Sequence, residues 1–263
     1  DITIYGGEAG RASLGLYADN GDDNADKWQL VSRTNNNIAL RSYSTGSWVY
    51  HLQLDANSRI SLSNNDNGTA NSLLGSLAGE NIVSGANNNV YVGATAGRNL
   101  NNAANDSNVA IGSAAMLGAS SGTRTAAKNI GIGVQALQNI TTGSHNVAVG
   151  DVTMLSITEG DKNTAIGSSA GTAITTGEQN VVLGYQALLA GINNSYNVVI
   201  GVEAFKTADD GENNNVAIGW GAGQLVNNSG ADENVFIGTF AGKGGTGALT
   251  KSVARCKCFK KHC

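Results

Sequence analysis

Residues that could carry catalytic or metal-binding chemistry are few in this chain and stand far apart. Histidine occurs at three positions, His51, His145 and His262. His51 lies in an alternating segment beside Tyr50, and His145 lies in a Thr-Gly-Ser-His-Asn segment typical of an exposed turn. No serine or cysteine nucleophile stands in a recognisable catalytic motif. We therefore assign His51 and His145 to structural rather than catalytic roles.

The cysteines all lie in the last eight residues, where the composition turns basic; they are Cys256, Cys258 and Cys263. Together with His262 they could supply soft ligands to a metal, but their spacing matches no standard zinc pattern. We expect an unstructured tail here and no metal site. Interchain disulfides that lock an oligomer are the alternative.

Clustered carboxylates occur in loops, at Asp22 with Asp23 and at Asp209 with Asp210. Paired acids hydrolyse glycosidic bonds when they are held at a suitable separation, but nothing in this spacing favours that geometry. Residues 19–26 are also acidic, as a calcium site requires, yet they lack the residue order of an EF-hand loop. We expect a solvated loop, no cofactor and no enzymatic activity.

The overall composition argues against two compact α/β domains, which would need more large apolar residues to build their cores. The 263 residues include 36 Gly, no Pro, 5% aromatic and 14% charged residues, and the formal charge is −4. An acidic chain of this kind lacks the electrostatic signature of nucleic-acid binding, and no apolar run approaches the roughly 20 residues of a membrane-spanning helix. The chain opens on Asp1 without a recognisable signal peptide, so we expect a processed chain or a fragment.

A short motif, N-x-x-[VIL]-G, recurs ten times and is the strongest signal in the sequence. Successive Asn residues are 18, 19, 21, 17, 17, 17, 17, 18 and 19 positions apart. Such a period indicates stacked repeats, and a thin solenoid needs few large apolar residues because each coil contacts only its neighbours. The first copy starts at Asn71, and the other nine use Asn89, Gly93, Asn108, Gly112, Asn129, Gly133, Asn146, Gly150, Asn163, Gly167, Asn180, Gly184, Asn197, Gly201, Asn215, Gly219, Asn234 and Gly238.

Each part of the motif has a physical reason to recur. Stacked Asn side chains can form an amide ladder, and Gly after a strand suits a corner that needs positive φ. The apolar residues one and three positions after Asn, such as Val109 and Ile111, predict a short strand whose two side chains point the same way. The residue between them is never charged, so we expect both faces to be buried, one inside the coil and one against another copy of the chain. On this basis Ile166→Asp should place a charge in a dry interior.

The position directly after the corner Gly varies most: it holds Ser168, Tyr185, Val202, Trp220 and Thr239 in five successive copies. Variation of this kind predicts exposure. Tyr185 and Trp220 are therefore candidate receptor contacts, since exposed aromatic rings often serve binding. The alternative is an apolar stripe that a neighbouring subunit or a folded arc covers.

Three segments follow from these patterns. Residues 1–63 alternate rather than repeat, as in Trp28, Leu30 and Ser32, and predict about six short antiparallel strands. Residues 64–242 form the repeat array, a parallel β-roll or β-solenoid, and residues 243–263 form the basic, cysteine-containing tail. The fold class is therefore an all-β fibre.

The copies that start at Asn108 and Asn215 read N-V-A-I-G, which resembles the head motif of trimeric autotransporter adhesins. The 17-residue form, with T-T-G ahead of the motif, is similar to repeats of bacteriophage tail fibres, and the segment from Ala18 to Asp23 also resembles tail-fibre sequence. The resemblance covers nearly everything up to Gly242. It implies a homotrimer, and the adhesin repeat is shorter than the one found here.

From the pattern and the resemblance we expect a tail-fibre segment in the virion that mediates host attachment as a rigid shaft or receptor-binding region. Its expected partners are other tail or baseplate proteins and a host-surface glycan or protein, without nucleic acid or membrane insertion. The alternatives are a bacterial trimeric surface adhesin head, at the bacterial cell surface, and a fibre-borne polysaccharide depolymerase.

Overall fold

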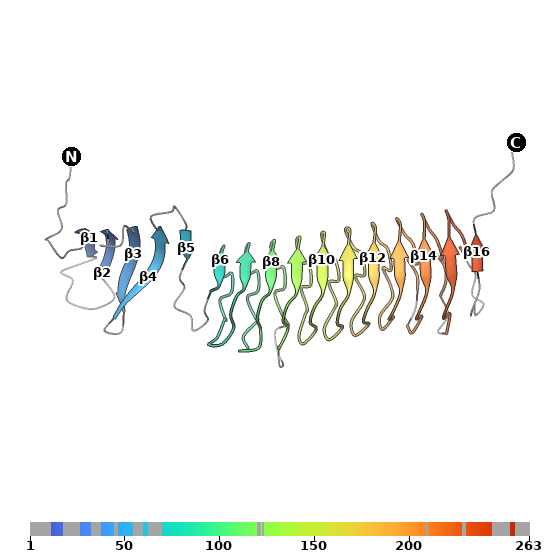
Figure 1. The fold of residues 1–263 in the computed structure, drawn as a ribbon, viewed down its shortest axis with the longest axis horizontal. Helices are drawn as coiled ribbons and strands as arrows, with labels where there is room; N and C mark the ends of the chain where they lie inside the picture. The colour runs from blue at the N-terminus through green and yellow to red at the C-terminus, as the bar shows by residue number, and fades with distance from the viewer. Residues whose placement is uncertain are drawn as a thin grey trace, which may run out of the picture.

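The computed structural model describes residues 12–17, 27–32, 38–44, 47–54, 60–62, 70–119, 122, 124–208, 210–227, 230–243 and 253–255. These residues form two β-sheets, which confirms the all-β class (Figure 1). No helix in this part of the chain is long and apolar enough to cross a membrane. Ile2 and Ile4, the acidic loop at 19–26 and the three cysteines lie outside the described residues.

The N-terminal sheet is an antiparallel meander of five strands in the order β1-β2-β3-β4-β5. Its strands are β1 (Ala12–Tyr17), β2 (Lys27–Ser32), β3 (Ile38–Ser44), β4 (Ser47–Leu54) and β5 (Ile60–Leu62). One leucine from each of the first four strands lies in a row across one face, through the pairs Leu14↔Leu30, Leu30↔Leu40 and Leu40↔Leu52. The pairing continues into β5, where Leu62 is opposite Leu52. The alternating pattern of the sequence thus places one apolar row on a single face, as a period of two requires.

A register shift between Leu40 and Arg41 interrupts the alternation in β4. Because of it, Tyr50 pairs with Arg41 whereas Leu52, two residues further on, pairs with the adjacent residue Leu40. Regular pairing would have placed Tyr50 opposite Ser42. The extra residue of a β-bulge reverses the phase of every residue that follows it.

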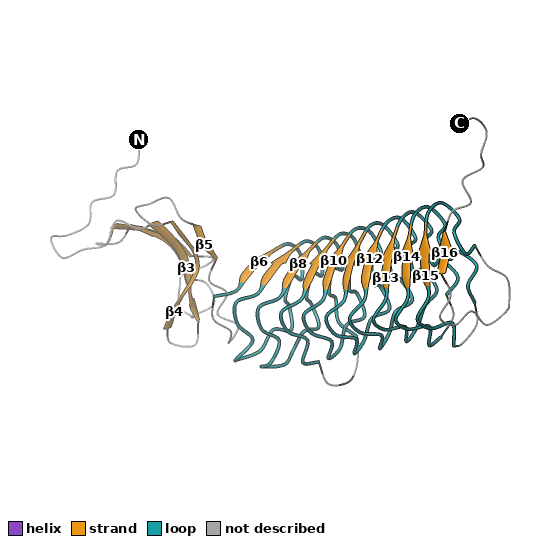
Figure 2. Cartoon of the chain, turned by 45° about the vertical axis from the view of Figure 1, so that its right-hand side comes forward, coloured by secondary structure: helices purple, strands orange, loops and turns teal. Residues whose placement is uncertain are grey.

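The repeat array is a parallel β-solenoid with one short strand per coil (Figure 2). Each coil contributes a three-residue strand that pairs in register with the strands of the coils before and after it. The strands are β6 (Ser72–Leu74), β7 (Val90–Val92), β8 (Val109–Ile111), β9 (Ile130–Ile132), β10 (Val147–Val149), β11 (Thr164–Ile166), β12 (Val181–Leu183), β13 (Val198–Ile200), β14 (Val216–Ile218), β15 (Val235–Ile237) and β16 (Val253–Arg255).

The last strand, β16, comes from the segment that the sequence pattern assigned to the basic tail. It pairs in parallel with β15, with Val253 opposite Val235 and Ala254 opposite Phe236. The sheet of the array therefore has eleven strands and extends beyond residue 242. This coil lacks the Asn of the motif, because Ser252 stands where the other coils carry Asn.

The interior of the coil is lined by the middle residue of each strand. Ala110, Ala148 and Ala165 are fully buried, whereas Ile111 and Ile166, each one residue further on, are 37% and 45% exposed in the single chain. Ile166 therefore does not lie inside the coil of its own chain, and the expectation is wrong in that respect. A three-residue strand has one inward side chain, and the repeat uses the middle position for it.

The Asn of each motif is buried and forms the amide ladder that stacked repeats allow. At Asn146, the backbone N–H and Nδ2 donate to Oδ1 of Asn129 (2.9 and 3.1 Å), and Nδ2 also donates to the Gly160 carbonyl of the next coil (2.8 Å). The same pattern joins Asn163 to Asn146 and Asn180 to Asn163. Each side chain thus links the coils before and after it, and buried amides with these partners stabilise the stack.

The Gly of each motif forms the corner after the strand. At these positions φ lies between 119° and 137°, a region that residues with a Cβ rarely adopt. The corners also stack closely: a Cβ on Gly184 would lie 2.5 Å from the carbonyl oxygen of Gly201 in the next coil. Both the conformation and the close approach therefore require glycine.

Candidate functional site

The outer face of the array sheet carries two parallel rows of aliphatic side chains. They are the first and third residues of each strand, and in-register pairing places each above its equivalent, as in Val181↔Val198 and Leu183↔Ile200. From β7 to β15 every residue in these rows is Val, Ile or Leu except Thr164. Strands of a sheet stand about 4.8 Å apart, so the rows run for roughly 40 Å along the rod.

This outer face is partly exposed in the single chain and carries no charge from β7 to β15. Ile130 and Ile132 are each 36% exposed, Val181 is 37% exposed and Ile237 is 49% exposed. Two rows of partly exposed aliphatic residues form one contiguous apolar surface, which we call the aliphatic face. Surfaces of this kind are typical of interaction sites.

A second surface follows the corners at the carboxyl ends of the strands. Tyr185, Val202 and Trp220 come directly after the corner glycines of three successive coils and are 50%, 45% and 53% exposed. The sequence analysis predicted this exposure. No arc among the described residues covers these side chains, and the two proposed contacts, Tyr185 and Trp220, lie on coils separated by one other coil.

The rings at this corner have close neighbours. The ring centroid of Trp220 lies 4.6 Å from that of Phe240, with the ring planes inclined by 49°. The ammonium group of Lys243 also lies over the Phe240 ring, 4.2 Å from its centroid. Sequence reasoning missed Phe240 because it stands two residues after its corner Gly rather than one.

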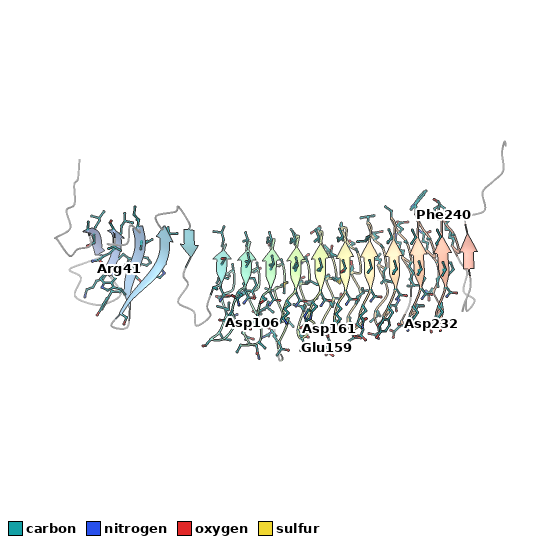
Figure 3. The ribbon with its side chains drawn as sticks, viewed as in Figure 1. Arg41, Asp106, Glu159, Asp161, Asp232 and Phe240 are labelled. Carbon is teal, nitrogen blue, oxygen red and sulfur yellow. The ribbon has the colours of Figure 1, made fainter. Side chains whose placement is uncertain are left out.

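The opposite edge of the rod, where the arcs lead into the strands, is polar and acidic (Figure 3). Carboxylates there cap backbone groups of the preceding coil: Asp161 Oδ1 accepts from the Ser144 N–H (2.5 Å), and Asp232 Oδ1 accepts from the Asn213 N–H (2.6 Å). Tyr196 donates its hydroxyl to Glu178 (2.9 Å), and this bond raises the pKa of the exposed phenol. These acids therefore have structural partners.

The described histidines have no catalytic arrangement around them. His51 Nε2 lies 2.8 Å from Ser42 Oγ, and the His51 ring stacks on Trp28 at 4.8 Å within the N-terminal sheet. His145 is an exposed turn residue with φ of 61°. In the described part of the chain, no three His, Cys, Asp or Glu side chains come together as a metal site would require.

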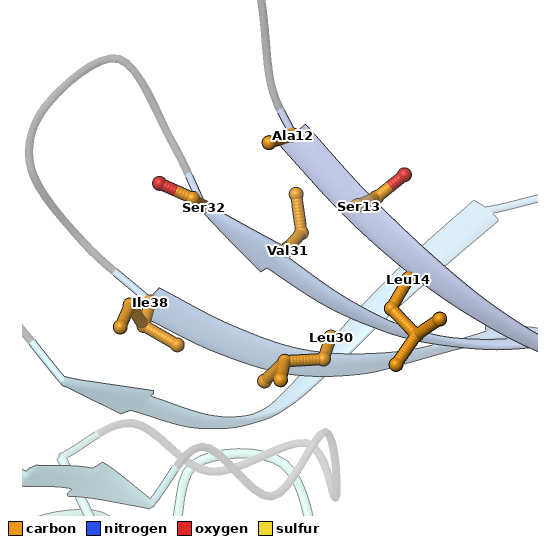
Figure 4. A pocket seen from close by; sticks show the side chains of 7 residues that line it. All are labelled: Ala12, Ser13, Leu14, Leu30, Val31, Ser32 and Ile38. Carbon is orange, nitrogen blue, oxygen red and sulfur yellow. The ribbon is translucent and has the colours of Figure 1, made fainter. Parts of the chain in front are cut away.

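A hollow of about 210 Å³ lies at one end of the N-terminal sheet (Figure 4). It is lined by Ala12, Ser13, Leu14, Leu30, Val31, Ser32 and Ile38. The lining has no titratable group, so it supports no acid–base or metal chemistry. Leu14 and Leu30 of this lining belong to the leucine row, whereas Val31 alternates to the opposite face of the sheet.

No protein-family model, curated protein or solved structure matches this chain. The chemistry of the chain must therefore be inferred from its own surfaces. Two of these stand out: the aliphatic face along the strands, and the aromatic corner near the C-terminal end of the array.

Proposed function

We propose that this chain is a segment of a homotrimeric attachment fibre, of the kind carried by bacteriophage tails. It would act as a rigid shaft or receptor-binding region at the host surface, in a virion, beside other tail or baseplate proteins. The observation that supports this most directly is the aliphatic face, which runs along the array with only Thr164 interrupting its two rows between β7 and β15. A soluble single chain rarely exposes a contiguous apolar surface of that extent.

A second copy of the same chain, aligned in parallel, is the partner whose rows have the same spacing as those of the aliphatic face. Its own rows repeat at the same interval, coil by coil, which would let the two surfaces interdigitate along the array. Rotation about an axis parallel to the rod closes such a contact into a ring. The resemblance of the N-V-A-I-G copies to trimeric adhesin heads favours three chains in that ring.

The native mass tests this proposal. Sedimentation equilibrium should return three times the 26.8 kDa mass of one chain. The double variant Ile166→Asp and Ile200→Asp places charges on the aliphatic face and should shift the mass toward a single chain, because unpaired charges are costly in a dry interface. The β-sheet circular dichroism should persist, since neither side chain fills the coil.

Thr142→Asp is the matched control, because Thr142 is exposed on an arc away from the strands. This variant should keep the wild-type mass. A wild-type chain that sediments as a monomer, or a double variant that stays trimeric, would contradict the proposed assembly.

A further inference from the structure

The aromatic corner near the C-terminal end of the array has the geometry of a narrow binding platform. We call it the corner strip and define it as Tyr185, Val202, Trp220 and Phe240. These residues follow β12, β13, β14 and β15 in four successive coils. Figure 3 places Phe240 at the edge where the strands end, away from Asp106, Asp161 and Asp232 at the other edge.

The backbone under the strip is held by a ladder of hydrogen bonds. The Glu203 N–H donates to the Tyr185 carbonyl (2.9 Å), the Gly221 N–H to the Val202 carbonyl (2.9 Å) and the Phe240 N–H to the Trp220 carbonyl (2.8 Å). The spacing of the side chains is therefore set by the spacing of the coils. Tyr185 and Trp220 are two coils apart, which corresponds to about 10 Å.

Polar groups flank the rings and are themselves fixed. Glu203 accepts from Lys206 Nζ (2.8 Å) through one carboxylate oxygen and from Gln224 Nε2 (2.7 Å) through the other. Lys243 is exposed beside Phe240. The strip thus combines exposed ring faces with amide, carboxylate and ammonium groups at its border.

The coil itself does not need aromatic residues at this place. None of the equivalent positions in the six earlier coils is aromatic, although those coils have the same strand and corner; these positions hold Ser76, Ala94, Ser113, Val134, Asp151 and Ser168. Packing of the solenoid therefore does not explain Tyr185 or Trp220. Two half-exposed rings on a rigid backbone are better explained by a ligand that contacts them.

The size and form of the strip favour one class of ligand. A stable protein–protein interface uses roughly 20–30 residues on each side, whereas the strip has four. A sugar chain is narrow, and each pyranose has an apolar face that packs on aromatic rings, whose amphipathic character suits such contacts. In an extended β-1,4-linked chain, alternate residues present the same face, at an interval close to the Tyr185–Trp220 spacing.

We propose that the corner strip binds an extended β-1,4-linked polysaccharide, with alternate pyranose rings on Tyr185 and Trp220. Val202 lies under the intervening sugar, and Phe240 supports Trp220 from the side. Glu203, Gln224 and Lys243 are positioned to hydrogen-bond the hydroxyl groups. This inference rests on the proposed attachment function and names the chemistry of the receptor.

Titration of the full chain with chitohexaose and cellohexaose, followed by tryptophan fluorescence and calorimetry, tests the inference. At least one of these β-1,4-linked probes should bind and change the fluorescence, whereas isomaltohexaose, a flexible α-1,6-linked chain, should not. Trp220→Ala and Tyr185→Ala should each weaken binding roughly tenfold, as expected for the loss of one aromatic contact.

Tyr196→Ala is the matched control, because Tyr196 is also an exposed tyrosine (47%) but precedes β13 at the opposite end of the strands. It should bind like wild type, and circular dichroism should show that all three variants are folded. Absence of binding to both β-1,4-linked probes, or equal binding by Trp220→Ala and wild type, would overturn the inference. Sedimentation of the same samples distinguishes the proposed assembly from the proposed ligand. A trimer that does not bind these polysaccharides would contradict the proposed ligand and leave the proposed assembly standing.

Discussion

Ala165 and Ile166 are consecutive residues of β11 that lie on opposite sides of the coil wall: Ala165 is fully buried, and Ile166 is 45% exposed. This division recurs in every described coil from β7 to β15, where the middle residue of the strand is buried. The array thus has a dry interior that belongs to one chain and an apolar exterior that is available to another. We therefore expect folding and the proposed assembly to depend on different residues of the same short strand.

Ala165→Asp should unfold the array, whereas Ile166→Asp should affect assembly. The aspartate at position 165 would bury an unpaired carboxylate, which we expect to cost about 4 kcal/mol or more. Chemical denaturation followed by circular dichroism measures the difference. Equal loss of stability in both variants would contradict the assignment of the two sides.

Asn163→Ala should destabilise the chain by about 3 kcal/mol. It removes the acceptor for the backbone N–H and Nδ2 of Asn180 and the donor to the Gly177 carbonyl, and buried unsatisfied groups cost about 1–3 kcal/mol each. Asn139→Ala, at an exposed position, should change the free energy of unfolding by less than about 0.5 kcal/mol. Urea titrations of the two variants provide the comparison, and similar midpoints would argue against the ladder as a stabilising element.

Gly97→Ala should be strongly destabilising because the ring of Tyr91 occupies the space beside Gly97. A Cβ there would lie 2.5 Å from Cε2 of Tyr91, and φ is +60°; we expect a loss of about 2–4 kcal/mol from overpacking and strain. Gly211→Ala is the control for strain alone, since Gly211 also has positive φ (+92°) but no neighbour within 4 Å. Thermal melts should show a larger decrease in melting temperature for Gly97→Ala than for Gly211→Ala.

Tyr91→Phe should stabilise the chain by about 1 kcal/mol at neutral pH, because the buried hydroxyl lies beside Asn108 but makes no hydrogen bond of good geometry with any described residue. Desolvation by burial also raises the pKa of Tyr91 above its ordinary value of 10.0. The native chain therefore keeps this proton above pH 10 where the unfolded chain has lost it, so wild-type stability falls as pH rises through that range.

The free energy of unfolding of Tyr91→Phe should therefore exceed that of wild type by an amount that grows by up to about 1.4 kcal/mol per pH unit above pH 10. Denaturation of both proteins from pH 8 to 11 measures this slope. A constant difference across the range would show that Tyr91 titrates normally.

Lys162→Asn should raise stability by about 0.5 kcal/mol. Lys162 is exposed with φ of 58°, a left-handed conformation that asparagine tolerates better than lysine. The same place in other coils already holds Asn88 and Asn214 with φ of 59°. Lys162→Val should lower stability, because a branched Cβ is least compatible with this conformation. A higher melting temperature for Lys162→Val than for Lys162→Asn would contradict the role of the left-handed backbone conformation.

The sequence by itself was sufficient to predict the stacked architecture. The motif Asn recurs at intervals of 17 to 21 residues, and it shares hydrogen bonds with the Asn of the preceding coil across the longest interval as well as the shortest. The corner glycines and the exposure of Tyr185 and Trp220 followed from the same period. Local chemistry determined these features, so local patterns revealed them.

Which side of the strand faces inward was decided only by the tertiary structure. In Val109-Ala110-Ile111 both outer residues are more apolar than the middle one, so hydrophobicity places Ile111 inside, whereas the coil encloses Ala110 and leaves Ile111 37% exposed. The bulge in β4 and the Asn-free strand β16 were likewise hidden, because each depends on pairing with a neighbouring strand. Periodicity specifies that side chains share a face, but the space available inside the coil determines which face that is.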